Sequence, residues 1–246
     1  MKDITALVLA GGKGTRFHPY TELIPKPMIP IGMEERPVLE FIVRWLTRFE
    51  IRDIVMLLNH RWRYIKNYFN AGERFGANIK YSIDDPDGYT NTGGAIYKAI
   101  SEGLVKKRAL IWYGDILAKI DLNDLIAFHE RNASELTLVV SNKYSVPVGI
   151  VELDEEKRVR KMTEKPELDI NATIGVALME TEVFSSNVVE ELGKSFDLMG
   201  DMVPLILKKE RRVYAYVYDG IWYDVGSLER YKKINAENLD REFNFI

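Results

Sequence analysis

Hydrophobic residues in the first half of the chain follow two alternating patterns. Strands are predicted at residues 4–10, 53–59, 79–83 and 109–113. All of them except the short strand at 79–83 contain a continuous apolar run, as expected for strands that are buried on both faces. Between these runs, apolar residues recur every three or four positions, which is typical of amphipathic helices. The helices predicted in this way span residues 37–49, 61–71 and 94–104. This β-α-β alternation predicts a mainly parallel sheet with helices on both faces.

The second half of the chain has shorter strand-like segments and fewer helical patterns. Acidic and basic residues at 154–157 indicate a hairpin loop, so antiparallel strands are expected around it. Ser227 is a suitable N-cap for a closing helix. The strands predicted here span 135–142, 148–153, 159–162, 174–179 and 213–218, and the helices span 202–209 and 227–241.

The chain has no internal repeat, low-complexity tract or linker, so we expect a single α/β domain with a mixed, mainly parallel sheet in three layers. Its 246 residues can bury a substantial core, and its net charge of −3 gives no reason to expect nucleic acid as a partner. No apolar run is long enough for a transmembrane helix, and Met1-Lys2-Asp3 does not begin a signal peptide. A cytoplasmic protein is expected. Without cysteine, disulfides and thiolate catalysis are excluded.

The segment after the first strand is rich in glycine and carries two cations. Gly11, Gly12 and Gly14 allow a tight turn whose backbone amides can approach a ligand. Arg16 follows directly, and Lys26 lies between two prolines that stiffen its loop. Exposed amides with two cations suit a polyphosphate.

Two common phosphate-binding loops do not match this segment. The chain contains no G-x-x-x-x-G-K-[ST] string, and the G-x-G-x-x-G pattern fails at Phe17. An ordinary glycine-rich turn from strand to helix would account for the glycines, but it would not account for Arg16 and Lys26.

The same segment resembles the signature of the sugar-1-phosphate nucleotidyltransferases, which are also called nucleotide-sugar pyrophosphorylases. Their pattern is L-A-G-G-x-G-T-R-L-x-P-x-T followed by P-K-P-M-x-P, and the chain matches it from Leu9 to Pro30 except that Phe17 replaces leucine. The resemblance implies a Rossmann-like three-layer fold of the nucleotide-diphospho-sugar transferase type. Residues 1–132 would then form the nucleotide-binding half, and residues 133–246 would form the sugar-binding half with the closing helix. The left-handed β-helix that many members carry is not expected in this chain.

The resemblance also implies roles for individual residues. Arg16 and Lys26 would be catalytic, Arg16 on the leaving pyrophosphate and Lys26 between the α-phosphate and the incoming phosphate. Asp115, in Tyr-Gly-Asp, and Asp224, in Trp-Tyr-Asp-Val-Gly, would bind Mg²⁺. The nucleotide would be bound by Leu9, Ala10, Gly11, Gly12, Gly14, Thr15, Gly93 and Gly94.

On the sugar side, Glu164 and Lys165 match a Glu-Lys-Pro motif that contacts sugar hydroxyls and the sugar phosphate. The resemblance adds Gly149 and Thr173 to this group, although Thr173 stands where the family has asparagine. The three histidines, His18, His60 and His129, show no metal-ligand spacing and are interpreted as structural or exposed.

The expected reaction converts a nucleoside triphosphate (NTP) and a sugar 1-phosphate into a nucleotide sugar and pyrophosphate, with Mg²⁺ as cofactor. The Pro-Lys-Pro-Met string favours an enzyme similar to mannose-1-phosphate guanylyltransferases, and uridylyl or thymidylyl transfer to glucose 1-phosphate is the alternative. A glycosyltransferase and a non-catalytic nucleotide-sugar-binding subunit are alternatives of other classes. A homo-oligomer is compatible with the sequence, and no membrane partner is expected.

Overall fold

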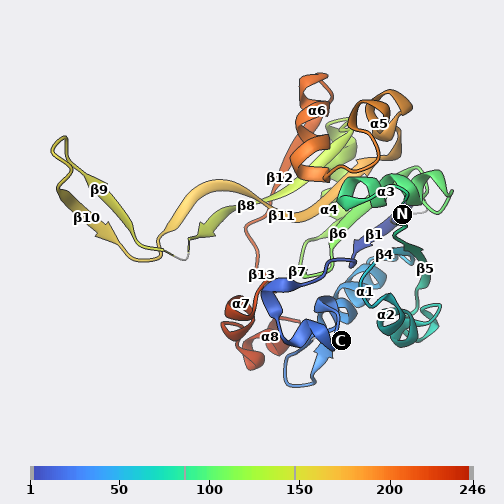
Figure 1. The fold of residues 1–246 in the computed structure, drawn as a ribbon, viewed down its shortest axis with the longest axis horizontal. Helices are drawn as coiled ribbons and strands as arrows, with labels where there is room; N and C mark the ends of the chain where they lie inside the picture. Colours follow the sequence, from blue (N-terminus) through green and yellow to red (C-terminus); the bar gives the residue numbers. More distant parts are fainter. Residues whose placement is uncertain (1–2, 86, 147, 244–246) are drawn as a thin grey trace.

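A seven-stranded sheet forms the centre of the computed structural model, which describes residues 3–85, 87–146 and 148–243 (Figure 1). Within this sheet β11 alone runs antiparallel to its neighbours, so the sheet is mixed and mainly parallel, as predicted. In spatial order its strands are β12 (Val213–Val217), β8 (Leu136–Ser145), β11 (Glu167–Glu180), β6 (Arg108–Tyr113), β1 (Ile4–Leu9), β4 (Asp53–Leu58) and β5 (Asn78–Ile83).

Helices cover both faces of the sheet, which gives the three layers expected from the sequence (Figure 1). One face packs against α1 (Val38–Arg48), α2 (Trp62–Phe69) and α4 (Leu122–Arg131). The other face packs against α3 (Asn91–Ser101), α5 (Ser186–Leu192) and α6 (Val203–Lys208). None of the helices in the described part of the chain is both long and apolar enough to cross a membrane.

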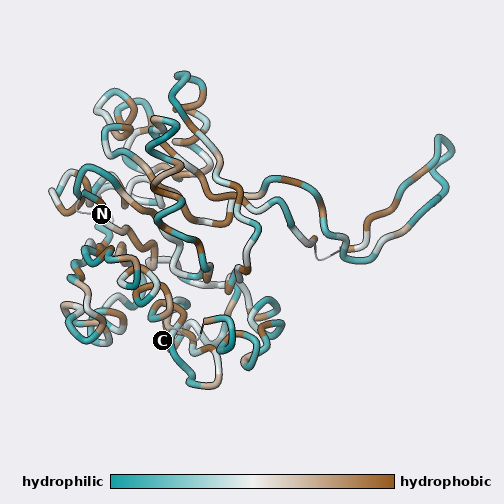
Figure 2. The backbone as a smooth tube through the Cα atoms, turned by 180° about the vertical axis from the view of Figure 1, so that it is seen from behind, coloured by the Kyte–Doolittle hydropathy of each residue, from teal (hydrophilic) through white to brown (hydrophobic). Residues whose placement is uncertain are grey.

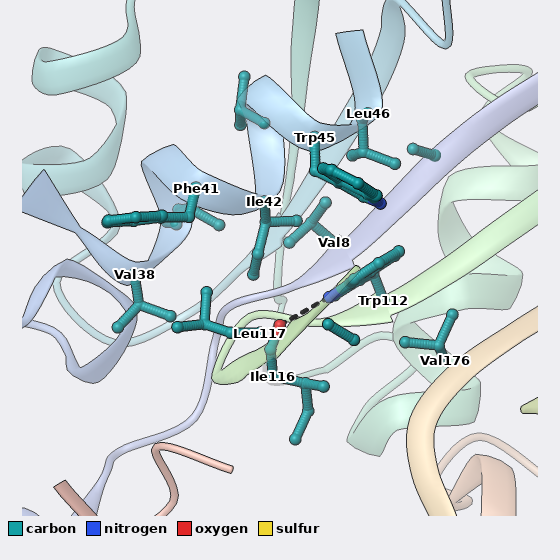
Figure 3. Close-up of a cluster of buried hydrophobic side chains, with 14 of the residues drawn as sticks. Val8, Val38, Phe41, Ile42, Trp45, Leu46, Trp112, Ile116, Leu117 and Val176 are labelled. Atoms are coloured by element: carbon teal, nitrogen blue, oxygen red, sulfur yellow. Dashed lines mark hydrogen bonds between the residues drawn. The ribbon is translucent and has the colours of Figure 1, made fainter. Parts of the chain in front are cut away.

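The apolar face of α1 packs directly onto the central strands, as its three-to-four-residue periodicity predicts. Figure 3 shows Ile42 and Trp45 of this helix above Trp112 of β6. The indole of Trp112 is fully buried, and its N–H donates to the Ile116 carbonyl at 2.8 Å. That bond satisfies the ring nitrogen and holds the turn that follows β6.

The end of the chain differs from the prediction of one closing helix over residues 227–241. It forms two short helices, α7 (Leu228–Lys232) and α8 (Ala236–Glu242). Ser227 caps the first as predicted, but Asn235 caps the second by accepting from the Asn238 amide at 2.8 Å. Because a second N-cap starts a new helix with a new axis, the continuous pattern is broken at this point.

A second difference concerns the strands around the predicted hairpin loop. β9 (Ile150–Leu153) and β10 (Val159–Thr163) pair only with each other, in a separate two-stranded sheet. Together with the outer ends of β8 and β11 they form a projection that we call the arm, which comprises the described residues between 143 and 169. The arm extends away from the rest of the molecule in both views (Figures 1 and 2).

Burial of His129 makes the stability of this fold depend on pH. Burial lowers the pKa of His129 to about 4, and the nearby Arg108 charge acts in the same direction. Its Nδ1 lies 2.8 Å from the Thr137 hydroxyl. The neutral ring is therefore favoured in the folded state, and below about pH 6.5 the unfolded chain binds the proton first.

We therefore expect the His129 contribution to stability to be complete above about pH 6.5 and to be lost as the pH falls towards 4. The loss amounts to at most about 3 kcal/mol of unfolding free energy. Denaturant unfolding of the wild type and of His129→Gln should show a shallower pH dependence for the variant over this range. Parallel profiles would contradict the assignment, because carboxylates contribute equally to both proteins.

Candidate active site

The glycine loop predicted to bind phosphate lies at the carboxyl end of β1, where it passes close to the end of β4. A methyl group built on Gly11 would lie 3.0 Å from the Asn59 backbone nitrogen, so a side chain would be crowded at this position. At Gly12, by contrast, no atom lies within 4 Å of such a methyl group. The first glycine is needed for packing, and the second leaves its surface open to a ligand.

Beyond this loop, a cavity of about 430 Å³ opens across the carboxyl ends of β1, β4, β5 and β6. Ligands of parallel α/β sheets bind at these strand ends. We call this cavity the first cleft. It is lined by Leu9, Ala10, Gly11, Gly12, Lys13, Lys26, Pro27, Leu57, Asn59, Asp84, Thr90, Asn91, Thr92, Ala95, Tyr113 and Asp115.

Lys26 and Asp115 form an ion pair on one wall of the first cleft. Lys26 is flanked by Pro25 and Pro27 and is the first residue of a single 3-10 turn, Lys26–Met28. Its Nζ donates to Oδ2 of Asp115. Their side chains are only 15% and 17% exposed, so the pair is largely shielded from water. The sequence predicted both residues for the site, and the structure brings them into direct contact although 89 positions separate them.

Asp224 reaches the same region through a short strand ladder. β13 (Trp222–Asp224) pairs with β7 (Ile116–Ala118), which places Asp224 opposite Ile116. The Val225 amide donates to the Asp115 carbonyl at 2.9 Å, so the two predicted metal ligands lie on adjoining segments. Each carboxylate has a basic partner, Lys26 for Asp115 and Arg230 for Asp224.

These two carboxylates fit a divalent cation that is shared with a nucleotide. Magnesium in proteins is commonly held by one or two carboxylates, with phosphate oxygens and water completing the octahedron. Among the described residues, no group of three or more His, Cys, Asp or Glu side chains could hold an ion without a substrate. The donor set is therefore suited to an ion that arrives with phosphate.

A second cavity of about 700 Å³ lies beside the β7–β13 ladder, and we call it the second cleft. Asp224 lines it, whereas Asp115 lines the first cleft. The two clefts therefore adjoin where the segments of Asp115 and Asp224 meet. The second cleft is lined by Arg16, Lys143, Tyr144, Val146, Lys165, Glu167, Trp222, Tyr223, Asp224, Ser227, Glu229, Arg230, Lys233 and Ile234.

The structure places Arg16 in the second cleft rather than beside the glycine loop amides. Arg16 lies in a 3-10 turn, Thr15–Phe17, which follows Gly14 in the left-handed conformation (φ 65°). Phe17 points into the core and is 1% exposed, so the neighbouring Arg16 side chain points outward. Lys13, which sequence reasoning did not single out, lines the first cleft instead.

The predicted nucleotide residues at the start of α3 lie behind the first cleft. The amides of Gly93 and Gly94 donate to the Phe196 carbonyl at 3.0 and 3.2 Å. A methyl group on Gly93 would lie 2.5 Å from the Phe196 ring, so this glycine allows close packing. The residues just before them, Thr90, Asn91 and Thr92, line the cleft in their place. Gly14 and Thr15 are not among the described lining residues.

On the sugar side, the structure brings only one predicted residue into a cleft. Lys165 lines the second cleft together with Arg16. Glu164 is 62% exposed at the root of the arm, close to Gly149. Thr173 is an exposed residue of β11. Gly149, Glu164 and Thr173 are absent from the described lining of both clefts. Gly149 and Glu164 lie in the arm, which extends away from the clefts, whereas Thr173 lies opposite Val140 in the main sheet.

Asn59 and Asp84 are further polar residues that line the first cleft, and neither is among the site residues predicted above. They follow β4 and β5, and the Asn59 amide donates to the Asp84 carboxylate at 2.9 Å. Burial raises the pKa of Asp84, while the bond from Asn59 opposes that rise. Burial, with the nearby Asp197 charge, also raises the pKa of Tyr113 to about 12, so its hydroxyl stays protonated. Since ligands bind at the carboxyl ends of parallel strands, the position after each predicted strand was the available signal.

Comparison with known proteins identifies the family of the chain. The sequence description of the nucleotidyl transferase family matches residues 5–241. The chain belongs to the nucleotidyl transferase family. It is similar to the UTP–glucose-1-phosphate uridylyltransferase of Synechocystis, with 30% identity over 98% of this chain and 65% of that protein. It is also similar to the mannose-1-phosphate guanylyltransferase of Mycobacterium tuberculosis, with 29% identity over 96% of this chain and 64% of that protein.

Solved structures of low sequence identity share the fold of this nucleotidyl transferase family member. HddC from Yersinia pseudotuberculosis, in complex with GMP-PN, has a TM-score of 0.73 and 21% identity, and 96% of this chain matches 99% of that one. A Bacillus anthracis structure in complex with sucrose has a TM-score of 0.74 and 20% identity, with 98% and 99% coverage. The chain spans a little under two thirds of the Synechocystis and M. tuberculosis relatives.

The contrast between Gly11 and Gly12 gives a test of how the loop is built. Gly11→Ala should lower the unfolding free energy by about 1–3 kcal/mol, because its methyl group would press on backbone atoms that cannot move aside. Gly12→Ala should leave stability within about 0.5 kcal/mol of the wild type, since its methyl group meets open space. Denaturant unfolding of both variants measures the difference, and equal losses would contradict this packing.

Proposed function

We propose that this chain transfers a nucleotidyl group from an NTP to a sugar 1-phosphate and releases pyrophosphate. An oxygen of the sugar phosphate attacks the α-phosphorus, and the bond from that phosphorus to the pyrophosphate oxygen breaks in line. This chemistry depends on positioning the phosphates and neutralising their charge. Family membership supports the reaction class, and two clefts that adjoin at Asp115 and Asp224 support the assignment of one substrate to each.

In this proposal the NTP occupies the first cleft, and the sugar 1-phosphate occupies the second. The open backbone at Gly12 and the Lys13 side chain would hold the triphosphate. Lys26 would leave its bond to Asp115 for the α-phosphate, and Arg16 and Lys165 would supply positive charge to phosphate oxygens entering from the second cleft. Glu164 would contact sugar hydroxyls only if the root of the arm moved towards this cleft.

Asp115 and Asp224 would hold Mg²⁺ together with oxygens of the bound nucleotide. When bound, the ion would neutralise charge on the phosphates and fix their orientation. Lys26 and Arg230, which pair with these carboxylates in the free protein, would then be available to substrate phosphate. Because NTPs and sugar phosphates are cytoplasmic metabolites, the proposed reaction implies a cytoplasmic location.

For the nucleobase, we infer that guanine is preferred. This inference rests on Asp84, a half-buried carboxylate that lines the first cleft and is oriented by Asn59. A carboxylate accepts two hydrogen bonds side by side, which matches the adjacent N1–H and N2–H donors of guanine. Uracil and thymine offer a single N–H donor that lies between two carbonyl oxygens, and a carboxylate would repel these oxygens. The M. tuberculosis guanylyltransferase is a relative at 29% identity, while the Synechocystis uridylyltransferase keeps uridylyl transfer as the alternative.

A panel of four NTPs against several sugar 1-phosphates, read out as released pyrophosphate, tests both the reaction and the preference for guanine. GTP should give the highest kcat/KM. Asp84→Asn should lower kcat/KM for GTP by about 10- to 100-fold and leave UTP nearly unchanged, because the amide offers one acceptor in place of two. Equal losses for all four NTPs would show that Asp84 does not recognise the base, and no pyrophosphate with any pair would overturn the reaction.

Lys26→Ala tests the catalytic wall of the first cleft. Removing a cation that contacts phosphate in the transition state should lower kcat about a hundred- to thousandfold. The matched control is Lys209→Ala. Like Lys26→Ala it removes the lysine of an ion pair with a carboxylate, here Glu191, but Lys209 lies at the end of α6 and lines neither cleft. Single-turnover rates for the two variants would separate chemistry from product release. Near-normal kcat in Lys26→Ala would contradict the assigned role.

A further inference from the structure

The second cleft has more positive charge than the phosphate of a simple sugar 1-phosphate requires. Five of its lining side chains are basic and three are acidic. Two of the basic side chains already have a carboxylate partner, because Arg230 pairs with Asp224 and Lys233 pairs with Glu229 at 2.7 Å. The basic side chains that remain are Arg16, Lys143 and Lys165.

Lys143 is the basic side chain of this cleft that the proposed reaction leaves without a role. It is exposed near the outer end of β8, and no acidic side chain of the described residues forms an ion pair with it. Asp169 lies opposite Lys143 in the β8–β11 ladder, but Asp169 does not line the cleft and no ion pair joins the two. The Lys143 ammonium is therefore available to an anion that enters the second cleft.

A carboxylate lies between Lys143 and Lys165 along the β8–β11 ladder. Glu167 is opposite Ser145, two residues from Lys143, so Glu167 and Lys143 start from the same face of the ladder. Lys165 precedes Glu167 by two positions, and all three side chains line the second cleft. Glu167 has no basic partner among the described residues. Along this wall, the cleft thus presents a cation, a carboxylate and a second cation in that order.

The spacing of the two lysines suits a ligand with an anionic group at each end. Lys165 comes four positions before Asp169, the residue opposite Lys143. The Val146 amide donates to the Pro166 carbonyl at 3.2 Å, so the pairing of the two segments continues almost to Lys165. At roughly 3.4 Å per residue, the backbones of the two lysines lie at most about 14 Å apart along the ladder. Two lysine side chains that rise from these positions leave room for a sugar ring between them.

We propose that the second cleft takes a sugar 1-phosphate that carries a second anionic group, a phosphate or a carboxylate, at the far end of its ring. This inference rests on the proposed function for the identity of the reacting phosphate. Lys165 contacts the 1-phosphate, Glu167 accepts hydrogen bonds from ring hydroxyls, and Lys143 pairs with the second anion. The cleft volume of about 700 Å³ lies within the range of pockets that enclose ligands of this size.

The test compares substrates that share a ring and differ only at carbon 6. Glucose 1-phosphate and mannose 1-phosphate are each compared with the corresponding hexose 1,6-bisphosphate and uronic acid 1-phosphate. Pyrophosphate released from GTP gives kcat/KM, and calorimetry without nucleotide gives Kd for the full-length protein.

The variant Lys143→Gln removes the charge that would meet the second anion. Its matched control is Lys232→Gln, which removes the same charge from an exposed position of α7 that lines neither cleft. Thermal unfolding should be the same in the wild type and both variants, because both lysines are exposed.

For at least one of the two hexoses, we expect the doubly anionic substrate to exceed its parent by about tenfold or more in kcat/KM and in affinity, as for a hydrogen bond between charged groups. Lys143→Gln should reduce this ratio to near one, whereas Lys232→Gln should keep the wild-type ratio. A gain with the bisphosphate alone identifies the second group as a phosphate, and a gain with the uronic acid alone identifies it as a carboxylate.

Failure of this inference is distinct from failure of the proposed reaction. Release of pyrophosphate with equal kcat/KM for all three substrates of each hexose would overturn the inference and leave the reaction standing. A preference that both variants lower equally would also overturn it, because net charge alone would then explain the effect. Tighter binding of the doubly anionic sugar that depends on Lys143, with no pyrophosphate released from any pair, would support the anion site and overturn the reaction.

Discussion

The ion pair between Lys26 and Asp115 ties the glycine loop to the centre of the sheet. The loop leaves β1, and Asp115 ends the turn after β6, so the pair joins two parallel strands at their carboxyl ends. Because both side chains are largely shielded from water, losing either partner would leave a charge in a poorly solvated place. The loop held here lines the first cleft and leads directly into the turn that carries Arg16.

The β7–β13 ladder extends this constraint to the other half of the chain. Through it, the segment that carries Asp224 returns to the centre of the molecule, and α7 follows with Arg230. Without the ladder, the two carboxylates would belong to separate parts of the surface. The two halves expected from the sequence are joined by this ladder and, independently, by the seven-stranded sheet. Their separate roles as nucleotide and sugar halves remain a prediction.

Much of the fold could be predicted because the central strands are continuous apolar runs, as in β4, and because α1 shows a clear helical period. The placement of Lys26, Asp115 and Asp224 in one site was predicted from the order of the family motifs along the chain, because the local hydrophobic pattern carries no information about it. The direction of the Arg16 side chain could not be read, since it depends on one 3-10 turn and on which neighbour enters the core. The arm was also beyond prediction, because alternating apolar residues indicate a covered face without saying what covers it.

The separation of the two clefts has a consequence for the order in which substrates arrive. Among the described residues, no side chain lines both clefts. Two molecules that occupy the clefts therefore do not compete for the same lining side chains. A compulsory order of addition would then come from the rearrangement of Lys26 and Arg230 when phosphate and its counter-ion displace their present bonds, rather than from competition for shared lining residues.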